Sequence, residues 1–284
     1  MKTLLVNLPV IVSDKQGRHV SGLKPEDFKV TSGGVSNEIV YFSDAQMPLN
    51  VAIVLDETGS VSGVLGGIRK AAKQFVSRLE PDDQCMVVTF GDKVRVRQPL
   101  TSNKNKIDGS LNSIRGIPGG IGLMNQAILE VVREQFAGVT GRKAIIVLTD
   151  AGEIVNRTRT MLEELIEGDT VVYSIYYPTT TFGLKGSKQT LAELTEKTPV
   201  GILSRMADVT AGRLLVADGS DFVSQFQTIT DELKKMYILG FYPEESTDGK
   251  ANNIDLRLVR TDLVLRTKSA IRPKAKLKPN VPSN

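Results

Sequence analysis

The sequence has little of what most catalytic and redox sites use. Among 284 residues it contains one cysteine, one histidine and no tryptophan. A single cysteine forms no disulfide within the chain, and Cys85 lies in an apolar run typical of a core strand. A Ser-His-Asp or Cys-His catalytic arrangement would need His19, which lies among predicted strands and turns. A hydrolase is therefore the least favoured class of function.

Long apolar runs and an excess of charge are also missing. No stretch of about 18 apolar residues occurs, which excludes an ordinary transmembrane helix. The first six residues favour a strand over a signal peptide, because Asn7 and Pro9 interrupt the apolar run, and we expect no export signal in this chain. The net charge of +4 equals the four basic residues of segment 272–284, and elsewhere 32 basic residues match 32 acidic ones. A nucleic-acid partner or membrane insertion therefore has little support.

The middle of the chain has the rhythm of an α/β domain. Apolar runs alternate with longer segments of helical periodicity from residue 50 onward, which is typical of βαβ units and a doubly wound, mostly parallel, Rossmann-like sheet. The predicted strands are 51–55, 85–90, 144–149, 171–176, 214–216 and 236–242, with an antiparallel edge strand at 93–97. The predicted helices are 64–79, 107–114, 123–136, 160–166, 203–210 and 222–234.

Short strands are predicted at both ends of the chain. They cover 4–12, 28–31 and 38–43, and a hairpin over 254–259 and 263–271 follows the α/β region. The late strands are too few for a domain of their own, so we expect a small β-sandwich built from both termini. The expected boundaries are 1–46 and 246–271 for the two halves of this sandwich, 47–245 for the α/β domain, and 272–284 for a disordered tail or linker.

Oxygen-bearing side chains follow two of the predicted parallel strands. Asp56, Thr58 and Ser60 come at alternate positions after one strand, and Asp150 ends another. Ligands of such sheets bind outside the carboxyl ends of the strands. Carboxylates and hydroxyls are hard donors suited to Mg²⁺, Mn²⁺ or Ca²⁺ rather than to zinc. The sequence therefore predicts a divalent-cation site at this edge.

At these residues the chain resembles the von Willebrand factor type A domain. Asp56-x-Thr58-x-Ser60 is similar to that family's D-x-S-x-S loop, Leu148-Thr149-Asp150 to its strand-4 acid, and the segment 119–123 to its G-G-T-x-L loop. Segments 22–28 and 237–243 narrow the resemblance to a bacterial "VWFA-related" family with flanking strands.

The resemblance implies a metal-ion-dependent adhesion site in an exported bacterial protein, whether periplasmic, on the cell surface or extracellular. The metal-site residues would be Asp56, Thr58, Ser60 and Asp150, with Mg²⁺ the expected ion and Mn²⁺ or Ca²⁺ as alternatives, and an acidic residue of a protein partner would fill the open position. The expected partner-binding rim consists of Glu57, Gly120, Ile121, Gly122 and Glu153.

The sequence departs from the family pattern at one position, and this departure allows two interpretations of the predicted metal site. Ile121 stands where the family has a threonine, and its side chain offers no oxygen. Mg²⁺ requires near-octahedral oxygen coordination, so either a water replaces that ligand or the site no longer binds a metal and Asp56 hydrogen-bonds its own loop. Two non-enzymatic functions follow. The first is a recognition or adhesion module that bridges an acidic partner residue through a cation, and the second is a metal-free scaffold or assembly module.

Overall fold

The apolar runs in the middle of the chain form the strands of one six-stranded sheet. The computed structural model describes residues 5–16, 18–44, 47–118, 122–152, 157–178, 198–217, 221–243 and 252–271. Five strands are parallel, and one edge strand is antiparallel as the sequence predicted. The order across the sheet is β10 (Arg213–Val216), β9 (Thr170–Tyr176), β8 (Arg142–Thr149), β5 (Leu49–Asp56), β6 (Gln84–Phe90) and the antiparallel β7 (Val94–Thr101).

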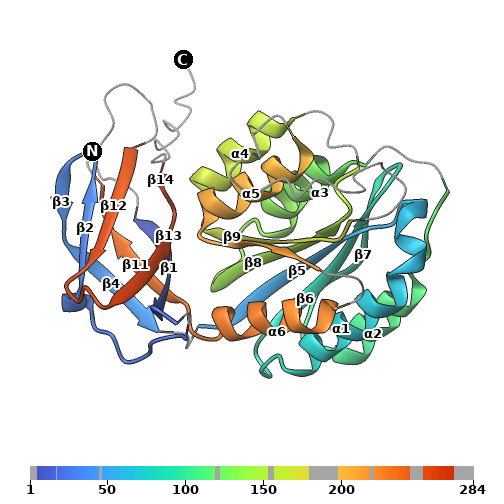
Figure 1. Ribbon diagram of the computed structural model, residues 1–284, viewed down its shortest axis with the longest axis horizontal. Helices are drawn as coiled ribbons and strands as arrows, with labels where there is room; N and C mark the ends of the chain where they lie inside the picture. Colours follow the sequence, from blue (N-terminus) through green and yellow to red (C-terminus); the bar gives the residue numbers. More distant parts are fainter. Residues whose placement is uncertain are drawn as a thin grey trace, which may run out of the picture.

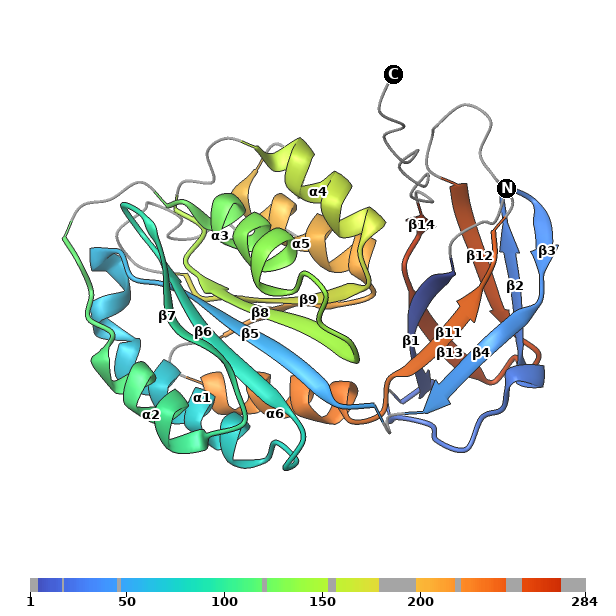
Figure 2. The same cartoon turned by 180° about the vertical axis from the view of Figure 1, so that it is seen from behind.

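Helices cover both faces of this sheet, as the two opposite views show (Figures 1 and 2). One face carries α1 (Leu65–Ser77), α2 (Lys104–Ser113) and α6 (Phe222–Leu233). The other face carries α3 (Met124–Glu130), which continues as a π-helical turn over Val131–Gln135, together with α4 (Thr158–Glu167) and α5 (Pro199–Thr210).

The central strand β5 explains why both faces are covered. Every residue of β5 is buried. Because successive side chains of a strand point to opposite faces, Val51, Ile53 and Leu55 enter the core beneath α1, α2 and α6. Ala52 and Val54 enter the second core, beneath α3, α4 and α5. A strand buried on both faces is a continuous apolar run in the sequence, and this is the α/β class that the sequence predicted.

Two small antiparallel sheets stand beside the α/β unit (Figure 1). Strands from both ends of the chain build them and enclose a separate apolar core, which confirms the predicted terminal β-sandwich. The first sheet has the order β13 (Leu263–Thr267), β1 (Val6–Asp14), β11 (Tyr237–Phe241), β4 (Ile39–Asp44). The second has the order β14 (Ala270–Ile271), β12 (Asn252–Leu258), β2 (Phe28–Ser32), β3 (Val35–Asn37), and a short 3-10 turn, Pro25–Asp27, precedes β2.

Two predicted pairings are wrong. The strand predicted at 236–242 does not join the parallel sheet, because β11 pairs antiparallel with β1 and β4. Its run is apolar throughout because Tyr237 and Leu239 face the sandwich core, whereas Ile238 contacts the core of the α/β unit. The segments 254–259 and 263–271 do not form the expected tight hairpin either. Only β14, at the end of the second segment, pairs with the start of β12, while the rest of β12 pairs with β2 and β13 pairs with β1 in the other sheet.

Buried polar contacts attach the sandwich to the α/β unit. Arg266 of β13 donates to the backbone oxygen of Ala211 at 2.9 Å and forms an ion pair with Glu232 of α6. Lys268, which is 2% exposed, donates its ammonium to the backbone oxygens of Ile166 and Gly168 at the end of α4. Burial lowers the pKa of Lys268 to about 8. Lys268 therefore satisfies carbonyls that the helix end leaves without an intrahelical partner.

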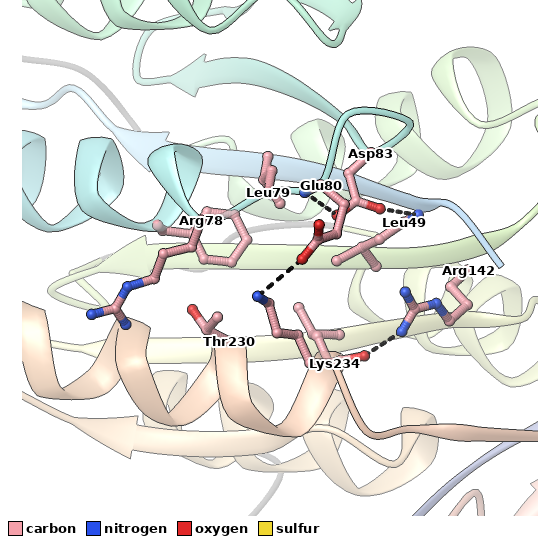
Figure 3. Close-up of a pocket in the computed structure, with 10 residues that line it drawn as sticks. Leu49, Arg78, Leu79, Glu80, Asp83, Arg142, Thr230 and Lys234 are labelled. Carbon is pink, nitrogen blue, oxygen red and sulfur yellow. Dashed lines mark hydrogen bonds and ion pairs between the residues drawn. The ribbon is translucent and has the colours of Figure 1, made fainter. Parts of the chain in front are cut away.

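Polar side chains close the amino end of the central sheet, opposite Asp56. Asp83 accepts hydrogen bonds from the backbone N–H groups of Leu49 and Glu80 at 2.8 and 2.9 Å (Figure 3). Arg142 donates to the backbone oxygen of Met47 at 2.7 Å. Leu49, Glu80, Asp83 and Arg142 line a cavity of about 160 Å³. Within the described ranges, no helix has the length and apolar character needed to cross a bilayer.

Candidate metal centre

The structure brings the ends of two neighbouring strands together at the carboxyl edge of the central sheet. β5 ends at Asp56 and the adjacent parallel strand β8 ends at Thr149, directly before Asp150. Asp56 is only 4% exposed. One of its oxygens, Oδ1, accepts from the backbone N–H of Thr58 at 2.8 Å, and Oδ2 accepts from the hydroxyl of Thr149 at 3.2 Å. The Asp56 carboxylate is therefore held at a fixed place at the head of the first loop.

Two hydroxyls of the same loop lie beside each other. The oxygens Thr58 Oγ1 and Ser60 Oγ are 3.0 Å apart and hydrogen-bonded, at the start of a 3-10 turn that spans Gly59–Gly63. The loop before α3 packs against this turn, because the N–H of Ile117 donates to the backbone oxygen of Glu57 at 2.7 Å. A Cβ on Gly116 would lie 2.1 Å from Ser62 Oγ, so a larger residue there would force the Ser62 side chain to rotate away.

Asp150 is half-buried and acts electrostatically on Asp56. Burial is the main cause that raises the pKa of Asp56, and the negative charge of Asp150 raises it further, while the hydrogen bonds from Thr58 and Thr149 oppose the shift. A carboxylate whose proton affinity is raised by a neighbouring negative charge also attracts a cation, because a bound positive charge removes the repulsion. Ala151 follows with a left-handed backbone, φ 57°, and its N–H donates to Thr149 Oγ1 at 3.0 Å.

Glu57 does not lie on the partner-facing rim where the sequence analysis placed it. Its side chain is fully buried, with Oε1 paired with Arg95 and Oε2 paired with Arg97 at 2.6 Å. A Cβ on Gly91 would lie 3.3 Å from Glu57 Cγ, which shows how closely the β6–β7 turn packs against it. The alternation of Arg95 and Arg97 on a predicted edge strand, both on one face, was the signal in the sequence for a buried carboxylate partner.

The remaining rim residues divide between described and undescribed positions. Gly122 is half-buried and lies two residues before α3, which starts at Met124. Gly120, Ile121 and Glu153 lie outside the described residues, so their predicted place on the rim stays a prediction, as does the predicted tail over 272–284.

The donor set that the structure assembles fits a hard cation. Asp56, Thr58, Ser60 and Asp150 offer two carboxylates and two hydroxyls, and all of these donors are oxygens, as Mg²⁺, Mn²⁺ and Ca²⁺ prefer. In the described part of the chain, no three His, Cys, Asp or Glu side chains cluster around one point. A cation at this edge would therefore be held by carboxylates and hydroxyls together, and the predicted ligand set stays a prediction. Sequence reasoning missed Thr149, whose hydroxyl holds Asp56.

Comparisons with known proteins agree with this architecture. A protein from Synechocystis sp., described as uncharacterized protein sll0103, is 37% identical over 54 residues, which are 19% of this chain and 13% of that protein. The chain thus matches about an eighth of the length of this relative. A von Willebrand factor type A structure from Catenulispora acidiphila has a TM-score of 0.53 at 10% identity and covers 96% of this chain and 74% of that one.

A second similar structure is described as holding zinc in its own metal-ion-dependent adhesion site (MIDAS) motif. Proximal thread matrix protein 1 from the mussel byssus, solved with a zinc-occupied MIDAS motif, has a TM-score of 0.55 at 16% identity and covers 70% of this chain and 48% of that one. At such identities the likeness concerns the fold. The model of the von Willebrand factor type A domain matches residues 50–214, more than half of the chain. The chain therefore belongs to the von Willebrand factor type A domain family, whose members generally mediate protein interactions and are usually non-enzymatic.

Proposed function

We propose that the carboxyl edge of the central sheet is a cation-dependent recognition site for a protein partner. The observation that carries the proposal is the meeting of buried Asp56 with Asp150 beside the paired hydroxyls of Thr58 and Ser60. These four side chains would hold Mg²⁺, with Mn²⁺ or Ca²⁺ as alternatives. When bound, the cation supplies a positive charge that takes a carboxylate of the partner.

The chain's own residues keep this edge ready for binding. The N–H of Thr58 and the hydroxyl of Thr149 hold both oxygens of Asp56, so the carboxylate loses little freedom when a ligand arrives. Glu57, fixed between Arg95 and Arg97, ties the first loop to the edge strand β7. A site that is organised before binding loses less affinity to ordering.

A metal-free scaffold or assembly module remains the second candidate. Ile121 favours it, because the family's second loop contributes an oxygen at this position and isoleucine cannot. The hydrolase hypothesis needed His19, and His19 lies in the sandwich, where its ring stacks on Tyr237 with centroids 6.2 Å apart. We also propose that the protein is exported from a bacterial cell. Fractionation of cells that produce the protein tests this.

Thermal unfolding of the full chain distinguishes the two candidates. Chelator-treated protein is heated with and without millimolar Mg²⁺, Mn²⁺ or Ca²⁺, and the Asp56→Ala variant is treated in the same way. A cation at a hundredfold excess over its Kd stabilises a protein by about 2.7 kcal/mol, or roughly 5–10 °C in Tm for a chain of this size. Asp255→Ala is the matched control, since it removes an exposed carboxylate of the sandwich.

We expect the cation-dependent rise in wild type and in Asp255→Ala, and its loss in Asp56→Ala. A wild-type Tm that responds to none of the three cations would contradict cation-dependent recognition and favour the scaffold. A rise that Asp56→Ala retains would show that the cation binds elsewhere.

A further inference from the structure

A buried tyrosine lies at the same sheet edge as the candidate metal centre. Tyr177 follows β9 directly, and its backbone N–H donates to the oxygen of Thr149 at 3.2 Å. In the register of the two strands Thr149 pairs with Tyr176, so Asp150 and Tyr177 are the next residues on each side. The Tyr177 side chain is 1% exposed, and its ring packs edge-on against Phe222 with centroids 5.7 Å apart.

The hydroxyl of Tyr177 has no hydrogen-bond partner among the described residues. A buried hydroxyl without a partner costs free energy, and native proteins pair the great majority of such groups. Phenylalanine would supply the same ring contact with Phe222 without that cost. The hydroxyl is therefore unexplained by packing.

The electrostatics of Tyr177 link its hydroxyl to the two acids of the site. Burial is the main cause that raises the pKa of Tyr177 well above its usual value, and the charges of Asp56 and Asp150 raise it further. Both acids are thus close enough to act on the phenol, which stays protonated at neutral pH. A protonated phenol both donates one hydrogen bond and accepts others, so it matches a carboxylate oxygen on one side and a bound water on the other.

We propose that Tyr177 is a positioning residue of the cation site, whose hydroxyl hydrogen-bonds the carboxylate and water oxygens that surround a bound cation. This inference rests on the proposed function. A water on a cation directs its protons outward and needs acceptors, and the tyrosine oxygen is one. The hydroxyl, which has no hydrogen-bond partner among the described residues, would gain one when a cation and its waters are bound. Residues that orient metal ligands in this way typically contribute 10- to 100-fold to metal affinity.

The test compares two substitutions that each remove one buried phenol oxygen from the same stretch of chain. Tyr177→Phe removes the proposed contact. Tyr173→Phe is the matched control. Tyr173 lies in β9, four residues before Tyr177, and it is also fully buried, with the charge of Glu232 acting on its phenol. Four strand residues span about 13 Å of backbone, and the charges that act on the Tyr173 phenol are those of Glu232, Arg266 and Arg213. Mn²⁺ affinity is measured by calorimetric titration of the chelator-treated full chain, together with the Tm of each metal-free protein.

We expect Tyr177→Phe to weaken Mn²⁺ binding 10- to 100-fold and Tyr173→Phe to change it less than twofold. The Tm of metal-free Tyr177→Phe should equal or exceed that of wild type, because the substitution removes an unpaired polar group. Equal Mn²⁺ affinity of Tyr177→Phe and wild type would overturn this inference alone. A wild type that binds no cation would overturn both this inference and the proposed function.

A second measurement needs no affinity value. The chain has no tryptophan and six tyrosines, so its near-ultraviolet absorption reports tyrosine environments directly. We expect Mg²⁺ to produce a tyrosine difference spectrum in wild type and in the control Tyr242→Phe, whose ring is exposed. The spectrum should be smaller in Tyr177→Phe, and the remainder comes from Tyr176, on which the charge of Asp150 also acts. A difference spectrum that persists unchanged in Tyr177→Phe would show that its hydroxyl does not sense the cation.

Discussion

Glu57 and Arg97 form an ion pair, with 2.6 Å between Oε2 of Glu57 and the guanidinium of Arg97. The Glu57 carboxylate is completely buried, although the next residue before it, Asp56, belongs to the candidate metal centre. Arg95 takes the other oxygen of Glu57 and also pairs with Asp92 at 2.8 Å. The first loop therefore carries two neighbouring acids with opposite roles. Glu57 is neutralised by the protein itself, whereas Asp56 shares its surroundings with a second carboxylate.

Replacing Glu57 should destabilise the fold more than any cation-site substitution. Glu57→Gln keeps the size of the side chain but leaves two arginines without their buried counter-charge, and breaking a buried pair costs about 3–5 kcal/mol. Asp92→Asn is the control, because Asp92 is 54% exposed and pairs with the same Arg95, so its loss should cost under about 1 kcal/mol. Urea unfolding of the two variants and wild type measures the difference, and equal midpoints for the two variants would contradict a structural role for Glu57.

Restoring the family's second-loop oxygen should strengthen cation binding. Ile121→Thr adds one hydroxyl to the set that Asp56, Thr58, Ser60 and Asp150 provide, and we expect about tenfold tighter Mg²⁺ binding, or ~1.4 kcal/mol. Ile121→Val is the control, since valine has the branched shape of threonine without its oxygen. Calorimetric titration with Mg²⁺ compares the three proteins. Equal affinities for the threonine and valine variants would mean that Ile121 does not stand where the cation's missing ligand belongs.

The sequence predicted the location of the site for a physical reason. Parallel strands place their carboxyl ends at one edge, so Asp56 and Asp150 had to meet once the apolar runs before them were identified as strands of one parallel sheet. The hydroxyls of Thr58 and Ser60 followed from their alternate spacing in one tight loop. These inferences need only the order of elements and the direction of the chain.

What the sequence could not predict depends on partners far away in the chain. Tyr237–Phe241 is apolar throughout, like a strand of the parallel sheet, and only its pairing with β1 shows that it belongs to the sandwich. Glu57 and Tyr177 lie next to polar loops, and their burial is set by Arg97 and Phe222, 40 and 45 residues away. Local patterns fix which residues form strands, whereas choice of neighbour is a tertiary property.

The buried ammonium of Lys268 should make stability rise at alkaline pH. Its pKa is lowered to about 8 from the 10.5 of an unfolded lysine, so between these values the unfolded chain holds a proton that the folded chain has released. Stability therefore rises with pH across that window, by up to about 3 kcal/mol for a fully buried group. Lys268→Met removes the titrating group. The unfolding free energy of wild type and of this variant is measured from pH 7 to 10.5, and that of wild type should increase relative to that of the variant as the pH rises. A constant difference would show that the amine does not titrate in this window.

The single histidine should make stability fall on the acid side. Burial, and after it the charge of Lys235, lowers the pKa of His19 to about 4 from 6.5, so the folded chain resists a proton that the unfolded chain accepts. Stability is fully present above pH 6.5 and is lost as the pH falls toward 4, by about 1–2 kcal/mol once solvent screening of this half-exposed ring is included. His19→Gln keeps a polar side chain of similar reach but has no proton to gain. Its Tm should fall less than that of wild type between pH 6.5 and 4, and parallel curves for the two proteins would mean that His19 takes up its proton as readily in the folded chain as in the unfolded one.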